Sequence, residues 1–298
     1  MNISEALIRG LSRRGFIKTA VAAVAATAVR TSSSQSAEAS PAPLIDTNVS
    51  LGRWPFRHHA LADTAALVAK LRQQGVTQAW AGHLDALLHK DISSVNARLA
   101  DECKQRGGRL LIPIGALNPM LSGWEEDLRR CVEVHRMPGI RLYPNYHGYK
   151  LSDPVFERVL HLASERNLLV QISVIMEEER TIHPLVNVPA ADTAPLAAVL
   201  AKFPKVRVQL LNAFRTLRGS PVLSLAARGV CFEIAMLDGL NGVERLLEQL
   251  PPDRLCFGSY APVFYFESAQ LKLRESVLTA AQMKSLCSDT AHRLIARS

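Results

Sequence analysis

The chain has 298 residues, of which 48% are hydrophobic and 21% charged, a composition that is ordinary for a soluble globular protein and argues against wholesale disorder. Its formal charge of +8 is spread thinly, and no basic run is interleaved with aromatic residues, so the composition argues against a nucleic-acid-binding protein. The five cysteines are widely spaced and form no Cys-x-x-Cys pair. We expect them to be small buried hydrophobic residues rather than members of a disulfide framework or ligands of a metal site.

The first 39 residues have the order of an export signal. Residues 12–18 (Ser-Arg-Arg-Gly-Phe-Ile-Lys) precede an apolar, Ala-rich run at 19–29, and residues 37–39 (Ala-Glu-Ala) form a small-x-small cleavage pattern. This order resembles a twin-arginine signal, which implies export of the folded chain by the twin-arginine translocase and a periplasmic location. The apolar run is too short to span a bilayer stably, and no transmembrane segment is expected in the mature chain. The alternative is a basic disordered tail beside an Ala-rich helix.

From residue 44 onward, apolar strand-like runs alternate with longer helical patterns. Strands are predicted at 44–49, 76–81, 109–116, 139–143, 168–174, 206–212, 229–235 and 254–258. Helices are predicted near 61–74, 91–106, 122–135, 154–166, 193–203, 220–228 and 241–250, with two more after the last strand. Asp63, Ser122 and Asp153 are predicted helix starts.

The repeat count decides between two α/β folds. Eight strand–helix repeats in residues 40–298 fit a single (β/α)8 barrel with an extra C-terminal helix. A doubly wound sheet shares the alternation, but no Gly-x-Gly-x-x-Gly follows the first strand. The sequence therefore predicts a barrel domain over 40–298, preceded by the signal at 1–39. A homo-oligomer is compatible with this sequence.

A series of short motifs resembles the amidohydrolase-related barrel family. They are Ile-Asp-Thr-x-Val at 45–49, Gly-Ile-Arg-Leu-x-Pro at 139–144, Asp-Pro at 153–154, Leu-Leu-Val-Gln-Ile at 168–172 and Phe-Gly-Ser-x-x-Pro at 257–262. The resemblance continues to residue 294 and so covers essentially the whole mature chain. It implies a barrel fold, a hydrolase, lactonase or non-oxidative decarboxylase activity, and a divalent cofactor, zinc or manganese.

The positions at which this family carries its metal ligands hold other residues here. The His-x-His pair after the first strand corresponds to Asn48 and Ser50. The histidines of the fifth and sixth strands correspond to Ser173 and Asn212, and the ligand aspartate after the eighth strand to Tyr260. Amide, hydroxyl and phenol groups are poor ligands for these ions. We therefore predict no metal site, with Asn48, Asn212 and Tyr260 binding the substrate by hydrogen bonds instead.

Polar side chains follow the fourth predicted strand. Strand alternation places Arg141 and Tyr143 on the same side, where Arg141 is predicted to clamp a carboxylate and Tyr143 to bind the substrate. His147 is a candidate acid or base near neutral pH. The alternative is a solvent-facing, Tyr-rich loop with a structurally bonded histidine. In the seventh strand, Glu233 stands among apolar neighbours and must face a polar lumen or be paired, which makes it the third candidate catalytic residue.

Other polar and aromatic residues carry weaker signals. Glu177 belongs to an acidic run that is expected to be solvated, although Glu177 and His183 could supply a base or an improvised ligand pair. His83 is expected to be structural, and His58 and His59 to be exposed. Four aromatic residues are candidates for a wall of the mouth, with loop-on-loop packing as the alternative: Trp54, Phe56, Tyr146 and Tyr260.

Two functions are compatible with these observations. The first is an exported hydrolase or lyase that acts on a small carboxylate- or carbonyl-bearing molecule without the usual metal. The second is a non-catalytic barrel that binds a small molecule or a partner. A barrel fold alone does not decide between them.

Overall fold

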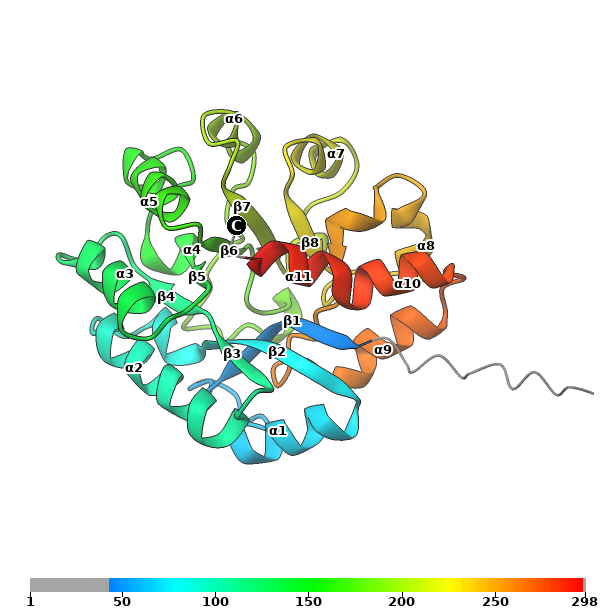
Figure 1. Cartoon of the computed structure of the whole chain (residues 1–298), viewed down its shortest axis with the longest axis horizontal. Helices are drawn as coiled ribbons and strands as arrows, with labels where there is room; N and C mark the ends of the chain where they lie inside the picture. The colour runs from blue at the N-terminus through cyan, green and yellow to red at the C-terminus, as the bar shows by residue number, and fades with distance from the viewer. Residues whose placement is uncertain (1–42, 297–298) are drawn as a thin grey trace, which may run out of the picture. The chain divides into compact units, whose positions relative to one another are not determined.

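The computed structural model describes residues 43–296, and the predicted export signal lies outside the described residues. All the strand pairings there are parallel. The strands are β1 (Leu44–Leu51), β2 (Val76–His83), β3 (Leu111–Pro113), β4 (Gly115–Leu117), β5 (Gly139–Leu142), β6 (Leu169–Ser173), β7 (Arg207–Leu211), β8 (Cys231–Glu233) and β9 (Leu255–Cys256). They surround a central lumen (Figure 1).

The strands close into the predicted eight-membered barrel. β3 and β4 are two halves of one barrel strand, because Ile114 between them donates its N–H to the carbonyl of Ala81 in β2 at 2.8 Å. The last strand returns to the first, since Thr47 N–H donates to Phe257 O at 3.0 Å and Tyr260 N–H to Asn48 O at 2.8 Å. The (β/α)8 prediction is therefore confirmed, with all eight barrel strands at the expected places.

The helices form the outer ring (Figure 1). They are α1 (Thr64–Gln73), α2 (Ile92–Glu102), α3 (Trp124–Glu133), α5 (Pro154–Glu165), α6 (Leu196–Leu200), α7 (Ser220–Ala227), α8 (Gly242–Leu247), α9 (Phe266–Arg274), α10 (Ala280–Lys284) and α11 (Thr290–Ile295). Asp63 caps α1 by accepting from Ala66 N–H, and Asp153 precedes α5, as predicted. α3 is preceded by Gly123 rather than by Ser122, and the short α4 (Pro144–His147) was not predicted.

Helix packing follows the apolar stripes in the sequence. In α5, Phe156, Val159, Leu160 and Ala163 recur at helical spacing and are all fully buried against the barrel. Burial of each large side chain contributes on the order of 1.5–3 kcal/mol. At the N-terminal end of the barrel, α11 covers the lumen with Ala291 and Leu294 (Figure 1).

One side chain satisfies backbone hydrogen-bonding groups at the seam between β2 and β4. Asn96 of α2 donates to Ala116 O at 2.8 Å and accepts from Ala116 N–H at 2.7 Å. The amide thus replaces the neighbouring strand that β4 lacks at this point, and both buried backbone groups are satisfied.

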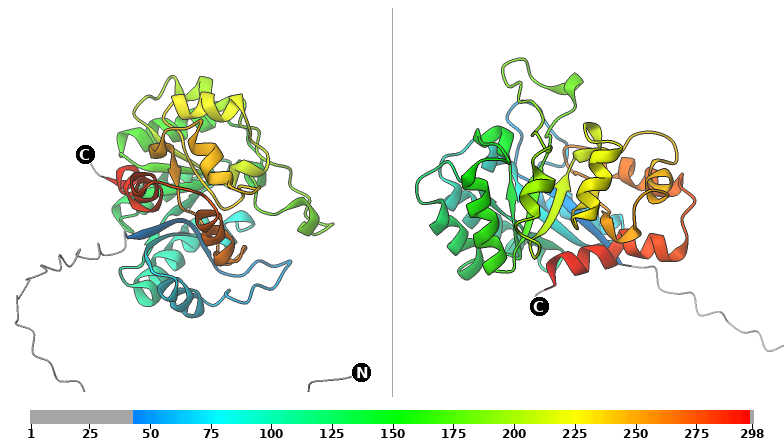
Figure 2. Two further views of the ribbon diagram at one scale, coloured as in Figure 1. Left: turned by 90° about the vertical axis from the view of Figure 1, so that its right-hand side faces the viewer. Right: turned by 90° about the horizontal axis from the view of Figure 1, so that it is seen from above.

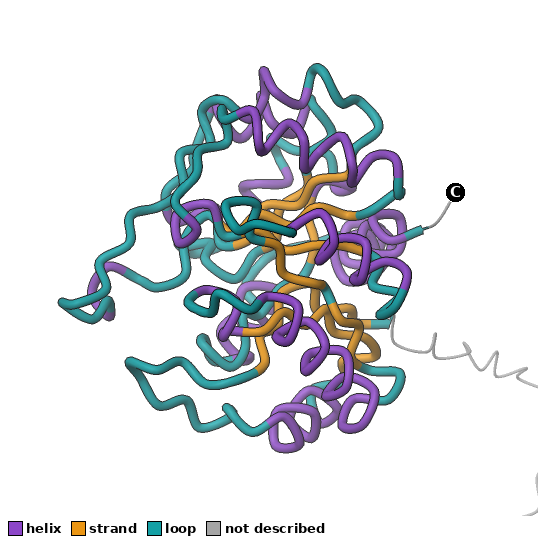
Figure 3. The backbone as a smooth tube through the Cα atoms, turned by 90° about the vertical axis from the view of Figure 1, so that its left-hand side faces the viewer, coloured by secondary structure: helices purple, strands orange, loops and turns teal. Residues whose placement is uncertain are grey.

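Two long loops extend from the C-terminal ends of the strands, on the side where active sites of such barrels are built (Figures 2 and 3). One follows β1 and the other follows β6. All five cysteines are buried and unbonded, as expected. Within residues 43–296, no helix is long and apolar enough to cross a membrane.

Candidate functional site

The floor of the lumen is a chain of buried hydrogen bonds. Arg141 of β5 donates from Nε to Gln171 Oε1 at 2.9 Å, from Nη1 to Val49 O at 3.0 Å and from Nη2 to Trp80 O at 3.2 Å. Gln171 in turn donates to Gln209 Oε1 at 2.8 Å. Arg141 is 1% exposed, and its hydrogen bonds connect β5 to β1, β2 and β6. Its role in this structure is therefore to hold these strands together beneath the mouth.

A glycine in β2 makes room for this guanidinium. A Cβ atom on Gly82 of β2 would lie 2.7 Å from Arg141 Nη1, closer than real contacts allow. The absence of a side chain at residue 82 therefore leaves room for the guanidinium beside β2.

Above this floor, Glu233 forms a carboxylate–amide group with Asn48 and Asn212. Asn48 Nδ2 donates to Asn212 Oδ1 at 2.9 Å and to Glu233 Oε1 at 3.2 Å. The backbone N–H of Asn212 also donates to Oε1, and that of Ala235 donates to Oε2. Three of the seven residues predicted for the site are thus in direct contact at the C-terminal ends of β1, β7 and β8.

The environment of Glu233 changes its acidity. The side chain is fully buried, and this burial raises its pKa from an ordinary 4.5 to about 7, against the opposing effect of the two backbone N–H donors. The ammonium of Lys272 also lowers this pKa and the carboxylate of Asp46 raises it. Glu233 can therefore gain or lose a proton near neutral pH.

Asp46 is a second buried carboxylate in the lumen. Its Oδ1 accepts from Ser259 N–H at 3.0 Å and from Asn48 N–H at 3.1 Å, and its Oδ2 accepts from the Ser259 hydroxyl. Burial raises the pKa of Asp46 to about 6, although these hydrogen bonds and the charge of Arg141 oppose the change. A register shift in β1 between Asp46 and Val49 accompanies this arrangement, as bulges do near active sites.

The segment Ile175–Met176, just after β6, occupies the mouth, and we call it the plug. Asn212 Nδ2 donates to Ile175 O at 2.9 Å, and Tyr260 OH donates to Met176 O at 2.7 Å. Ser173 Oγ lies 3.1 Å from Met176 Sδ. Asn212, Tyr260 and Ser173, which we matched by sequence to metal-ligand positions of the resembling family, therefore contact the protein's own chain.

Backbone conformation supports this role. Asn212 and Tyr260 both adopt positive φ angles, 56° and 58°. Such a conformation is common enough for asparagine, but for a bulky aromatic residue it is strained by about 1–3 kcal/mol. The surrounding structure fixes Tyr260 in this conformation, with its hydroxyl on the plug.

Apolar side chains complete the closure of the mouth. Leu84, Tyr143 and Met176 belong to one buried cluster with Trp54 and Tyr260. The small cavity beneath Trp54, Met176 and Tyr260 leaves no volume that a water molecule could enter. Glu233 itself is fully buried in this structure.

A divalent ion does not fit the residues at the mouth. Asn212, Ser173 and Tyr260 direct their donor groups at the plug, and Asn48 directs its N–H at Glu233. Amide and hydroxyl donors of this kind are not ligands that zinc or manganese selects. Within the described residues, no group of three His, Cys, Asp or Glu side chains lies together in a way that could hold a metal ion.

The remaining predicted site residues lie to one side. Tyr143 belongs to the apolar cluster, where burial raises its pKa and the charge of Arg141 opposes the change. His147, at the end of α4, is buried against Tyr143, with its ring centroid 5.8 Å away and its Nε2 2.9 Å from Ala86 O. Its ring therefore joins α4 to the loop after β2, and no hydrogen bond of the described residues links it to Glu233. His83 is buried too, where its Nδ1 accepts from Asp85 N–H.

The rim differs from expectation at two residues. Glu177 is 5% exposed rather than solvated, its Oε2 is buried without a hydrogen bond, and burial raises its pKa. His59 is 7% exposed, whereas His58 is exposed as expected. A residue's local sequence does not show burial of this kind, and Glu177 lies near Arg57 and Trp54 of the loop after β1. Phe56 and His183 join this loop to the loop after β6, with their ring centroids 5.2 Å apart.

The predicted aromatic wall is present in part. Trp54 packs edge-on against Phe56 and Tyr146, with centroid distances of 5.6 and 6.3 Å. Tyr260 instead pairs with Phe264, at 5.6 Å.

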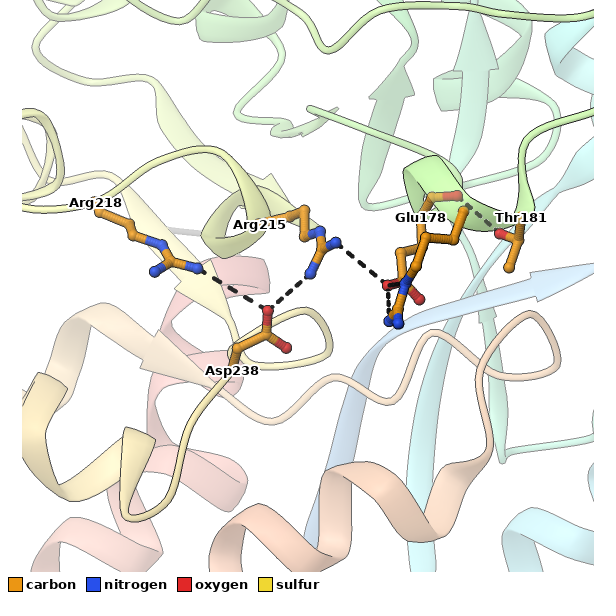
Figure 4. A network of polar contacts seen from close by, with 6 residues as sticks. Glu178, Thr181, Arg215, Arg218 and Asp238 are labelled. Carbon is orange, nitrogen blue, oxygen red and sulfur yellow. Dashed lines mark hydrogen bonds and ion pairs between the residues drawn. The ribbon is translucent and has the colours of Figure 1, made fainter.

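Ion pairs connect the loops farther out on the rim (Figure 4). Arg215 bridges Glu178 of the loop after β6, at 3.3 Å, and Asp238 of the loop after β8, at 3.0 Å. Arg218 lies 4.0 Å from the same aspartate. These pairs are partly exposed and each contributes about 0–1 kcal/mol, so they orient the loops more than they stabilise the fold.

Four lumen residues were missed by sequence reasoning: Asp46, Gln171, Gln209 and Ser259. Gln171 and Gln209 each have apolar neighbours on both sides within their strands, the same signal that identified Glu233. Asp46 and Ser259 were noted only as parts of motifs. A polar residue inside an otherwise apolar barrel strand is therefore the signal that would have found the two glutamines.

Comparisons with known proteins agree with this architecture. The sequence profile of the family described as Amidohydrolase matches residues 51–297. No curated protein matches the chain by sequence.

Solved structures share the fold at low identity. A 2,6-dihydroxybenzoate decarboxylase from Rhizobium superposes with a TM-score of 0.63 at 13% identity, covering 84% of this chain and 98% of that one. A 5-carboxyvanillate decarboxylase from Novosphingobium aromaticivorans, complexed with manganese, gives 0.66 at 13% identity, covering 86% and 96%. A putative amidohydrolase from Staphylococcus aureus gives 0.65 at 11%, covering 85% and 99%. The named decarboxylases are enzymes built on the same barrel.

Proposed function

This chain belongs to the amidohydrolase family, and on that premise we propose that it is a lyase or hydrolase in which Glu233 transfers the proton without a metal ion. The observation that carries the proposal is the position of Glu233. It is a fully buried carboxyl group at the C-terminal end of a barrel strand, held by Asn48 and by two backbone N–H donors, with its pKa raised to about 7. Proton donors and acceptors of this kind are most effective when their pKa is near the working pH.

We favour decarboxylation of a small aromatic acid as the reaction. The protonated Glu233 would deliver its proton to the carbon that bears the carboxylate, the bond to the carboxylate would break, and its electron pair would stay on the ring as CO2 leaves. A proton from the solvent then restores Glu233, so that the carboxylate form of the substrate and one proton give the arene and CO2. Two of the solved structures that share this fold are decarboxylases of 2,6-dihydroxybenzoate and 5-carboxyvanillate, which supports this substrate class.

A Glu233→Gln variant tests the proposal. We would incubate the wild type and the variant with 2,6-dihydroxybenzoate and 5-carboxyvanillate and follow the loss of the acid by chromatography. We expect turnover by the wild type and a loss of about 10²-fold or more in the variant, as for removal of a general acid. Glu248→Gln, an exposed glutamate on α8's C-terminal side, is the matched control and should leave the rate unchanged. Equal rates in wild type and Glu233→Gln would remove Glu233 from its role.

The second candidate is a non-catalytic barrel, and the plug is the observation that favours it. A fully buried Glu233, with the plug held in the mouth by hydrogen bonds from Asn212 and Tyr260, is the state expected of a barrel that no longer turns over a substrate. Metal analysis of protein purified without chelators distinguishes a metal-dependent enzyme from the two proposed alternatives, the non-catalytic barrel and the metal-free enzyme. One equivalent of zinc or manganese per chain, with activity lost after chelation, would contradict both proposals.

We further propose that the chain is exported by the twin-arginine route. The supporting observation is the order of residues 12–39 in the sequence. Changing Arg13 and Arg14 together to Lys should keep the protein in the cytoplasmic fraction, whereas the same change at Arg9 and Arg30 should not. Periplasmic recovery of the Arg13/Arg14 variant would refute the export proposal.

A further inference from the structure

A cavity of about 810 Å³ lies outside the plugged mouth, and we call it the vestibule. Residues 57–61 of the loop after β1, Glu178 and Thr181 of the loop after β6, and residues 262–268 before and within α9 line it. A smaller cavity of about 550 Å³ lies along residues 53–63 and shares residues 57–60 with the vestibule. The volume of the vestibule is in the range of sites that take small organic molecules.

Some charged side chains on the wall of the vestibule have ion-pair partners within residues 43–296 and others do not. Glu267 pairs with Lys70, and Glu178 pairs with Arg180 and Arg215. Arg57 is half-buried, and although its charge lowers the pKa of the nearby Glu177 carboxyl, no hydrogen bond or ion pair joins it to any of the described residues. The wall therefore offers a guanidinium, with its planar set of donors, to an anion that enters.

His59 stands beside this guanidinium. Its ring lines both cavities and is 7% exposed, and its Nε2 is buried without a hydrogen-bond partner. Burial, with the nearby charges of Arg57 and His58, lowers the pKa of His59, which favours the neutral imidazole. A neutral imidazole can donate or accept a hydrogen bond, and an unsatisfied buried nitrogen is costly unless a ligand supplies the partner.

Two other residues that line the vestibule, Phe264 and Tyr265, are aromatic. Phe264 packs on Tyr260 with a centroid distance of 5.6 Å, so its ring is fixed by the mouth. Tyr265 is 84% exposed, an unusual position for a large aromatic side chain. A flat apolar ligand would cover both rings and remove them from water.

We propose that the vestibule binds a small organic anion with a flat apolar body, whose carboxylate is held by Arg57 and His59 and whose rings lie against Phe264 and Tyr265. The site is separate from Glu233 and does not depend on the proposed proton transfer. Where the barrel is an enzyme, the vestibule would hold an acid outside the plug; where it is not, the vestibule would itself be the ligand site.

Calorimetric titration with 2-naphthoate tests the inference, with 2-naphthylmethanol as the neutral probe of the same ring system. We expect saturable binding of 2-naphthoate and an affinity for the alcohol that is lower by about tenfold or more, the usual effect of losing a charge-assisted hydrogen bond. Arg57→Gln and Tyr265→Ser should each weaken 2-naphthoate binding, with the larger loss in Arg57→Gln. Both residues are in loops and outside the core, so the melting temperature should stay unchanged.

Two controls make the result specific. Arg53→Gln changes an exposed arginine of the same loop that does not line the vestibule, and it should bind 2-naphthoate like the wild type. Glu233→Gln should also bind normally, which separates this inference from the proposed function. Equal affinity for the acid and the alcohol, or full affinity in Arg57→Gln, would overturn the proposal, as would no binding at millimolar 2-naphthoate.

Discussion

The buried carboxylate of Glu233 is packed closely against a glycine. The carboxylate lies against Gly258 of the loop after β9, where a Cβ atom would stand 2.6 Å from Oε2 and 2.8 Å from the Cβ of Glu233. A single missing methyl group therefore fixes how deep the carboxylate sits and which backbone N–H groups it reaches. Gly82 does the same for Arg141.

Gly258→Ala should displace the Glu233 carboxylate. We expect a loss of about 1–3 kcal/mol in the free energy of unfolding, as for overpacking of a core, and a fall in any Glu233-dependent turnover. Urea denaturation followed by circular dichroism measures the first effect. Gly242→Ala is the control, because its new Cβ would meet only the flexible side chain of Leu237 at 3.3 Å. Equal stability of the two variants would show that the packing at Gly258 is looser than described.

At the scale of elements, the loop after β6 decides whether the mouth is open. Its first residues accept hydrogen bonds from the ends of β7 and β9, and Asn145 Nδ2 also donates to Pro189 O farther along the loop at 2.9 Å. The loop is therefore attached at several points, while its middle projects from the barrel (Figures 2 and 3).

Tyr260→Phe should loosen the plug without unfolding the barrel. Loss of the bond to Met176 O leaves a buried carbonyl unsatisfied, so we expect amide exchange over residues 174–191 to rise by about fivefold to tenfold, with little change in the strands. Hydrogen-exchange mass spectrometry measures this. Tyr265→Phe removes an exposed hydroxyl nearby and should exchange like the wild type. No increase in Tyr260→Phe would mean that the apolar cluster alone holds the plug.

The seam at β4 depends on a single amide. Asn96→Ala should lower the free energy of unfolding by about 2–4 kcal/mol, because both backbone groups of Ala116 would be buried without partners. Thermal and urea unfolding provide the measurement. Ser94→Ala, a half-buried change on the same helix, should stay within about 0.5 kcal/mol of the wild type. A similar small effect in Asn96→Ala would mean that water satisfies Ala116.

For the whole molecule, the buried carboxyl groups link folding to pH. A carboxyl whose pKa is higher in the folded chain than in the unfolded one stabilises the fold below its unfolded pKa, and this contribution is lost as pH rises through the folded value. For Glu233 the window runs from 4.5 to about 7, and the corresponding free energy is about 3 kcal/mol.

Glu233→Gln should therefore flatten the dependence of stability on pH. Relative to the wild type, the variant should lose less stability between pH 4.5 and 8, by on the order of 3 kcal/mol, as measured by urea midpoints at each pH. Comparing the two proteins cancels the titration of histidines and other shared groups. Parallel pH profiles would show that Glu233 has the same pKa in the folded and unfolded chains.

The sequence by itself determined the barrel, its eight strands and most helix starts, because strand and helix periods follow from burial of side chains close together in the chain. It also showed the isolated charge of Glu233, since residue type alone shows this. The contact of Asn48, Asn212 and Glu233 followed from the barrel, because the ends of parallel strands meet at one mouth.

Only the tertiary structure decided how these side chains are used. Arg141 was expected to clamp a carboxylate, but its guanidinium donates hydrogen bonds to Val49, Trp80 and Gln171. These partners come together only when the barrel closes. The plug on Tyr260 joins residues 84 positions apart in the sequence, and Glu177 and His59 are buried although their local sequence predicts exposure. Such pairings depend on loop packing over long separations, for which a strand or helix period carries no information.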